Sequence, residues 1–123
     1  MTRPGATAQS LYTRLGGYDV IAAFVDNWLA LMAPDARLGR RIRTMSVDDR
    51  QAARQRLVDF IAERAGGPVV YTGPPIAHLR RRLGVALNDP AALRRADAAL
   101  VPLGVPADAR DGLLGFIAGL RKR

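Results

Sequence analysis

The chain has 123 residues, enough for one hydrophobic core and too few for two domains of ordinary size. Its 49% hydrophobic and 24% charged fractions are typical of a globular domain, and no apolar run approaches the roughly 18 residues that a membrane span needs. The lack of cysteine excludes disulfides and thiol redox chemistry, and a single histidine argues against a zinc site, because zinc sites usually combine several Cys and His ligands.

The chain carries a net charge of +8, and all of its 19 cationic side chains except Lys122 are arginines. Arginine binds phosphate groups well, which raises nucleic-acid binding as a role. However, the arginines are spread along the sequence and only 6% of the residues are aromatic, a pattern that favours a solvated basic surface. The first ten residues lack the apolar run of a secretory signal, so we expect a cytoplasmic protein without a membrane partner.

Segments with helical periodicity alternate with glycine and proline, which predicts an all-helical domain. A short amphipathic helix is predicted over 10–17, because Gly16 and Gly17 can take the left-handed conformation of a helix end. A core helix follows over 18–34 and ends at Pro34. Its apolar positions, at steps of three and four, are Ile21, Phe24, Val25, Trp28, Leu29 and Met32.

A second core helix is predicted over 46–67, where Ser46 and Asp49 have the spacing of a capping box and a glycine pair ends the pattern. A short helix from about 75 to 83 follows a loop rich in proline. The apolar face of the second core helix carries Ala53, Leu57, Phe60 and Ile61.

Two further helices are predicted in the last third of the chain. In the segment 88–106, either Asn88 or Asp89 can cap a helix whose first turn holds Pro90. The segment 107–123 has one apolar stripe and ends in three cations, which suit a helix C-terminus. We predict no strand.

Four stretches occur in order along the chain: SLYTRLGG, VDNWLALMAPDARL, FIAERAGGPVVYTG and LGVP. In this combination they resemble the group I truncated (two-over-two) globins of bacteria, over about Ser10 to Leu120. The resemblance implies an all-α truncated globin fold that encloses haem, in a single domain over 1–123 with a flexible extension at 1–9. It also implies O2 binding or NO detoxification, with a reductase as a further partner.

The position of the family's iron-binding histidine corresponds to Arg80. In the family this histidine lies nine residues after the tyrosine of Tyr-Thr-Gly, here Tyr71, and three residues before the leucine that precedes the next glycine, here Leu83. Both counts lead to Arg80. His78 is the only histidine of the chain and is therefore the candidate iron ligand if haem is bound.

The residues that line the haem pocket in the family have changed as well. The family's Phe-Tyr pair matches Trp28 and Leu29, and the phenylalanine pair after Asp-x-Arg-Leu matches Arg41 and Ile42. The tyrosine that binds O2 in relatives is therefore a leucine here. The resemblance assigns the cofactor-binding positions to Trp28, Leu29, Ile42, Ala53, Leu57, Phe60, Tyr71, Ile76 and Arg80.

His78 and Arg80 each leave several interpretations open. In a regular helix Ile76, Arg80 and Leu83 share a face, whereas His78 lies roughly 200° from Arg80 and faces solvent. His78 reaches the iron only if the helix begins later, which the two prolines before it would allow. Arg80 can extend to solvent, pair with a carboxylate such as Asp97, or bind an anionic group such as a haem propionate.

Two functions therefore follow from the sequence. The first is haem-based binding of O2 or another diatomic gas such as NO, with altered residues on both sides of the haem. The alternative is a haem-free sensor or interaction module with a globin fold, in which core side chains, or an apolar acid paired with Arg80, fill the cavity. No Ser/His/Asp group, phosphate loop or carboxylate pair indicates another enzyme class, and the sequence leaves the oligomeric state open.

Overall fold

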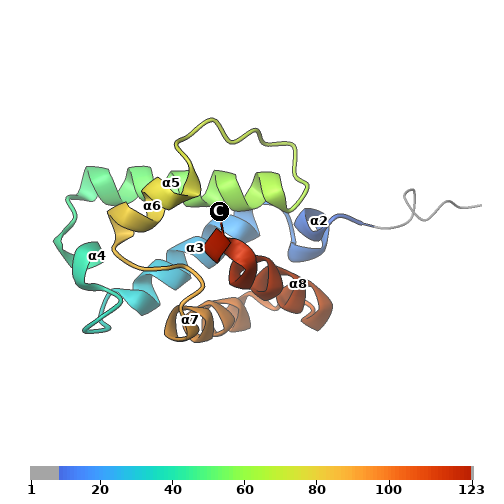
Figure 1. The fold of residues 1–123 in the computed structure, drawn as a ribbon. Helices are drawn as coiled ribbons and strands as arrows, with labels where there is room; N and C mark the ends of the chain where they lie inside the picture. Colours follow the sequence, from blue (N-terminus) through green and yellow to red (C-terminus); the bar gives the residue numbers. More distant parts are fainter. Residues whose placement is uncertain (1–8, 123) are drawn as a thin grey trace, which may run out of the picture.

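Helices form the regular structure of residues 9–122, the part of the chain that this computed structural model describes (Figure 1). No strand occurs in this range, which confirms the predicted all-α class. Within the same residues no helix is both long and apolar enough to cross a membrane. The predicted extension at 1–9 lies outside the described residues, apart from Gln9.

The helices are α2 (Leu11–Leu15), α3 (Tyr18–Met32), α4 (Arg40–Thr44), α5 (Val47–Arg64), α6 (Ile76–Leu83), α7 (Pro90–Leu100) and α8 (Ala107–Ala118), with 3-10 turns η1 (Val101–Leu103) and η2 (Gly119–Lys122).

Side-chain caps determine where two of the long helices begin. Ser46 Oγ accepts a hydrogen bond from the Asp49 N–H at 3.1 Å before α5, and the Asp89 carboxylate accepts one from the Ala91 N–H at 2.8 Å before α7. Both bonds satisfy amides that have no partner within the first helical turn. The predicted cap at Ser46 is confirmed, and of the two candidates before α7 the structure selects Asp89.

The long helix α3 lies in the middle of the fold (Figure 1). It packs against α5 on one side and against α7 on the other, while α8 packs against α7 and α2. The short helix α6 packs against α5 and α4. This arrangement puts one hydrophobic core between the α5–α6 pair and the α3–α7–α8 group. Its largest fully buried side chains are Trp28, Phe24, Ile21, Met32, Leu38, Ile42, Leu57, Ile61, Leu79, Leu83, Leu87 and Leu100.

The helix α4 and the buried face of α6 differ from what the sequence indicated. Helix α4 has five residues and buries only Ile42, so it shows no helical period in the sequence. In α6 the buried residues are Ile76, Leu79 and Leu83, which places Leu79 in the core and leaves Arg80 at the edge of the apolar face. This shift puts the apolar side chains of α6 toward α5 and the cationic ones toward the surface.

Candidate functional site

The apolar residues assigned to the cofactor pocket all belong to one buried cluster. None of them exposes more than 6% of its surface. An open cavity that could hold water would appear as exposed surface on the side chains around it. These side chains therefore contact protein atoms on nearly every side, except that Leu29 also borders a hollow of about 390 Å³ that Met45 and Arg50 help to line. They are Trp28 and Leu29 from α3, Ile42 from α4, Ala53, Leu57 and Phe60 from α5, and Ile76 from α6.

Trp28 fills the middle of this cluster and is completely buried. Its indole Nε1–H donates a hydrogen bond to the Ala92 carbonyl at 2.9 Å, and its ring stacks on Phe24 at a centroid distance of 5.3 Å. A buried indole needs a partner for its one polar group, and the carbonyl on α7 provides it. Trp28 therefore anchors α3 to α7 from inside the core.

Tyr71 is half-buried in the segment between α5 and α6. Its ring meets Phe60 edge-on at 5.5 Å, its backbone N–H donates to Glu63 at 3.1 Å, and its hydroxyl donates to the Pro74 carbonyl. Burial raises the pKa of the phenol, so the hydroxyl stays protonated and remains a donor. In this structure Tyr71 holds the loop that leads into α6.

His78 lies in the first turn of α6 and is half-buried. The core-facing positions of this helix are Ile76, Leu79 and Leu83, and His78 lies roughly 130° around the helix from the middle of that face. The imidazole is thus on the side away from the interior. Among residues 9–122 no group of three or more His, Asp or Glu side chains is arranged to hold a metal ion.

Arg80 runs from the edge of the core to the surface. Its Nε is inaccessible to solvent and has no hydrogen-bond partner within the described chain, and the residue helps to line a surface hollow. Asp97, which the sequence suggested as a partner, pairs instead with Arg110 at 3.6 Å. Arg80 is therefore half-buried: the Nε end of its guanidinium lies inside the protein, and the residue borders the surface on one side.

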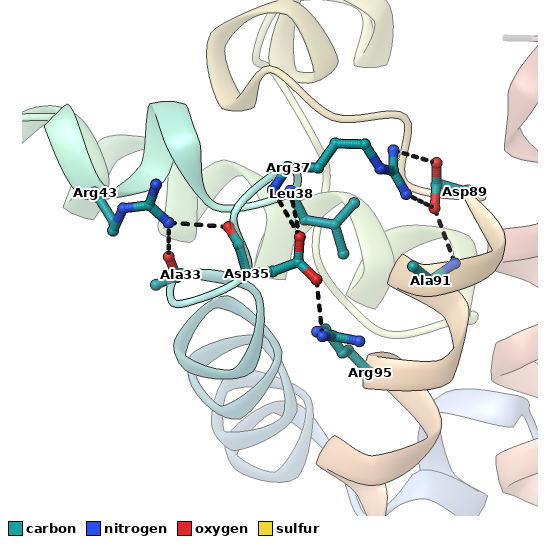
Figure 2. Close-up of polar contacts among 8 residues, drawn as sticks. All are labelled: Ala33, Asp35, Arg37, Leu38, Arg43, Asp89, Ala91 and Arg95. Carbon is teal, nitrogen blue, oxygen red and sulfur yellow. Dashed lines mark hydrogen bonds and ion pairs between the residues drawn. The ribbon is translucent and has the colours of Figure 1, made fainter.

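The Asp-x-Arg-Leu motif between α3 and α4 is the centre of a polar network (Figure 2). One Asp35 oxygen accepts from the N–H groups of Arg37 and Leu38, each at 2.8 Å, and the other accepts from Arg95 of α7 at 2.8 Å. Arg37 binds both oxygens of Asp89, at 2.9 and 3.0 Å. The motif thus joins the α3–α4 connection to the start of α7.

Arg37 and the backbone amides also determine the charge state of this network. The bidentate contact with Arg37 lowers the pKa of Asp89 from 3.8 to about 2, and the N–H groups of Leu38 and Arg37 lower the pKa of Asp35. Arg43 donates to the Ala33 and Asp35 carbonyls at 2.6 and 2.9 Å. Both carboxylates therefore stay ionised over the neutral pH range and hold the start of α4 in place.

The sequence prediction did not identify a group of arginines that α4 and α6 bring together. Arg41 of α4 packs beside Gly84 at the end of α6, which carries Arg80 and Arg81. Gly84 lines two surface hollows, one with Arg40 and Arg41 and the other with Arg80 and Arg81. The sequence does contain a pattern that points to these arginines, because the stretches 36–47 and 64–88 contain no acidic residue. What the sequence did not indicate is that these stretches meet.

Comparison with known proteins identifies the family. The family model described as bacterial-like globin matches residues 10–123. A group 1 truncated hemoglobin of Mycolicibacterium paratuberculosis is 31% identical over 117 residues, which cover 94% of this chain and 83% of that protein. The chain belongs to the truncated hemoglobin family.

Solved structures of truncated hemoglobins have the same fold. The Fe(III) form of the Tetrahymena pyriformis protein matches with a TM-score of 0.77 and 23% identity, over 93% of this chain and 96% of that one. The 2/2 hemoglobin of Synechococcus sp., in the cyanomet state and with covalently attached heme, matches with a TM-score of 0.73 and 22% identity, over 94% and 95%. The truncated globin fold expected from the four sequence stretches is confirmed.

The side chains at the positions that the resemblance assigns to the haem pocket leave little open space between them for a haem. The family resemblance places haem beside α6, with α5 on its distal side, but here the two helices pack together with Cα atoms within 8 Å. A planar macrocycle needs van der Waals space of about 3.5–4 Å on each face. Leu57 of α5 and Leu79 and Leu83 of α6 belong to the same buried cluster, and each is no more than 2% exposed. The expected ligand position holds a guanidinium, which has donors only and no acceptor atom for iron.

Proposed function

We propose that this member of the truncated hemoglobin family works without haem, as a globin-fold module that binds a ligand or partner through its surface. One observation carries the proposal: the side chains at the family's haem-lining positions pack against one another, each at most 6% exposed. Filling this space with Trp28 and leucines stabilises the fold by the same burial that a cofactor would otherwise provide. The arginine at the iron-ligand position supports the same conclusion.

Haem-based binding of a diatomic gas is the second candidate. Family membership favours it, and His78 lies on α6 only two residues before the expected ligand position. In that case α6 would have to turn by about a third of a revolution to bring the imidazole inward. The turn would also move Leu79 out of the core, which costs about 2 kcal/mol of apolar burial.

Haemin titration of the purified chain, followed by absorption in the Soret region, tests the proposal. We expect no saturable band at one haemin per chain. The matched variants are His78→Ala, which removes the only imidazole, and Arg80→His, which restores the family's ligand at its position. Because the interior is filled, we expect Arg80→His alone to leave haemin binding unchanged.

Three outcomes would overturn the proposal. A stoichiometric band that His78→Ala abolishes would establish the second candidate. A band that persists in His78→Ala would show a haem protein with another ligand. Tight binding gained by Arg80→His alone would show that the interior accepts haem and that only the ligand is missing.

A further inference from the structure

Two arginine-rich segments without acidic residues come together at one place on the surface. The segment 36–47 contains four arginines around α4, and the segment 64–88 contains four more, three of them at the end of α6. Helices α4 and α6 pack against each other. Neither segment contains a carboxylate that could pair with its own arginines. Any carboxylate partner must therefore come from another part of the fold.

Within the described residues, the arginines of α4, of α6 and of the connection before α4 divide into those that have a hydrogen-bond or ion-pair partner and those that have none. Arg82 lies 3.4 Å from Asp49, and Arg37 and Arg43 take part in the network around Asp35. Within residues 9–122, four others have neither a carboxylate within 4 Å nor a hydrogen-bond acceptor for the guanidinium. These four are Arg40, Arg41, Arg80 and Arg81, and we refer to them as the α4–α6 arginine cluster.

Gly84 brings the two halves of the cluster together. It ends α6 with φ +73°, and a Cβ at this position would lie 2.4 Å from Cγ of Arg41. The lack of a side chain thus lets the stem of Arg41 cross the end of α6. Gly84 borders a hollow of about 460 Å³ together with Arg40 and Arg41, and an adjoining hollow of about 360 Å³ together with Arg80 and Arg81.

The cluster has charge and space for a small anion with more than one anionic group. Each guanidinium presents a planar fork of donors that matches two oxygens of a phosphate. The Nε of Arg80 is buried and has no acceptor within the described chain, and the residue lines one of the hollows, so its charge is held beside that hollow without a carboxylate partner. Each of the two adjoining hollows is lined by two arginines of the cluster, an arrangement that matches two linked phosphate groups better than one.

The surroundings of the cluster argue against a nucleic acid. Asp89 beside Arg37 and Asp49 beside Arg82 limit the positive surface on two sides, whereas a duplex needs a broad cationic face. No aromatic side chain lines either hollow, so bases of a single strand have nothing aromatic to stack on. The site therefore suits a compact polyphosphate.

We propose that the α4–α6 arginine cluster binds a small molecule that carries linked phosphates, either an inorganic polyphosphate or the phosphate chain of a nucleotide. This proposal deepens the proposed function, on which it rests, because it names the ligand class of the surface module. The guanidinium forks contact the phosphate oxygens, and the hollow around Thr44 and Gly84 receives the chain.

Calorimetric titration of the full chain with tripolyphosphate tests this proposal. We expect saturable binding of one tripolyphosphate per chain, weakened by added salt. Arg40→Gln and Arg81→Gln remove exposed arginines without an ion pair, and each should weaken binding about tenfold, the effect of one charge-assisted hydrogen bond. Arg94→Gln is the matched control, because Arg94 is also exposed and unpaired but lies on α7, and it should change the affinity less than about twofold.

Titrations with other ligands show whether the site recognises a nucleotide or only the phosphate chain, and whether it prefers linked phosphates to other anions. Adenosine triphosphate that binds more tightly than tripolyphosphate assigns the site to a nucleotide, and equal affinity assigns it to the phosphate chain alone. Equally tight binding of orthophosphate, of a short polyglutamate or of a DNA duplex would contradict the proposal, as would an effect of Arg94→Gln equal to that of Arg40→Gln.

The two proposals fail in different ways. If tripolyphosphate does not bind and haemin does not bind, the ligand class is wrong and the haem-free module remains. If haemin gives a stoichiometric Soret band while tripolyphosphate binding and its loss in Arg40→Gln persist, the haem-free function is wrong and the phosphate site remains as a site on a haem protein.

Discussion

At Gly84 the backbone adopts a left-handed conformation, and the Arg41 side chain occupies the place where a Cβ of residue 84 would lie. Two separate constraints therefore require glycine at this position: φ is +73°, and the Arg41 side chain lies where a Cβ would be. Gly104 provides a comparison, because its φ is +66° but no atom lies within 4 Å of an added Cβ. Comparing the effects of the same substitution at the two sites therefore isolates what the contact between α4 and α6 contributes to stability.

We predict that Gly84→Ala destabilises the protein more than Gly104→Ala does. A left-handed residue with a side chain costs about 1 kcal/mol, and the contact with Arg41 adds to that cost only at Gly84. Urea unfolding should give a lower midpoint for Gly84→Ala than for Gly104→Ala. In the double variant with Arg41→Ala, the loss should be smaller than the sum of the single losses, because Cγ of Arg41 is gone. Strict additivity would show that the contact contributes nothing.

At the scale of elements, the connection from α3 to α4 is held against α7 by charged groups rather than by a long apolar interface. Asp89 has two tasks there: it caps α7 through the Ala91 N–H, and it binds both terminal nitrogens of Arg37 (Figure 2). Asparagine is also a good helix cap but carries no charge. A substitution can therefore separate the two tasks.

We predict that Asp89→Asn lowers the stability at neutral pH by about 1 kcal/mol, a value reduced for the solvent exposure of Arg37. The pKa of Asp89 is lowered from 3.8 to about 2 on folding. The stabilisation is thus complete above pH 3.8 and is lost as the pH falls toward 2. Chemical unfolding of both proteins at several pH values should show the difference shrinking over that range. A difference that is constant with pH would show that the carboxylate charge has no part in it.

The position of α4 also connects this network to the arginine cluster. The hydrogen bonds of Asp35 and Arg43 fix the turn before α4, and α4 carries Arg40 and Arg41. The Asp-x-Arg-Leu motif, which the sequence marks only as a family feature, therefore positions half of the proposed phosphate site. In this chain the motif acts on the surface of the fold, while its leucine is buried in the core.

At the scale of the whole molecule, one continuous core extends from α3 to all the longer helices. The single tryptophan lies at its centre, where it is fully buried and hydrogen-bonded to α7. Small domains with one core commonly unfold in a single step. In this protein the Trp28 environment and the helices should then be lost together.

We predict coincident urea transitions of Trp28 fluorescence and of far-UV circular dichroism, with the same midpoint and the same slope. The reason is that buried side chains of α3, α5, α6, α7 and α8 belong to one continuous cluster, so we expect the core to open as a unit. A fluorescence transition that precedes the loss of helix would indicate a loosely packed interior, and with it a weaker argument against a haem pocket.

Much of this fold could be predicted from the sequence, because the information is local. The apolar period of 18–34 and of 46–67, the caps at Ser46 and before Pro90, and the glycine and proline residues between helices each act within a few residues. The four family stretches indicated the order of the helices. Helix α4 escaped prediction because a helix of five residues with one buried side chain has no period to detect.

The sequence by itself determined the all-α class and the family, and it predicted an arginine at the ligand position, since helix periods, caps and motif spacing are read along the chain. The buried core and the α4–α6 arginine cluster depend on residues far apart in sequence. Leu57 and Leu79 belong to one buried cluster, and Arg41 packs beside Gly84. Burial and the pairing of charges are properties of side chains that meet in space. Periodicity shows which face of a helix is apolar, but only packing shows what occupies the space in front of it.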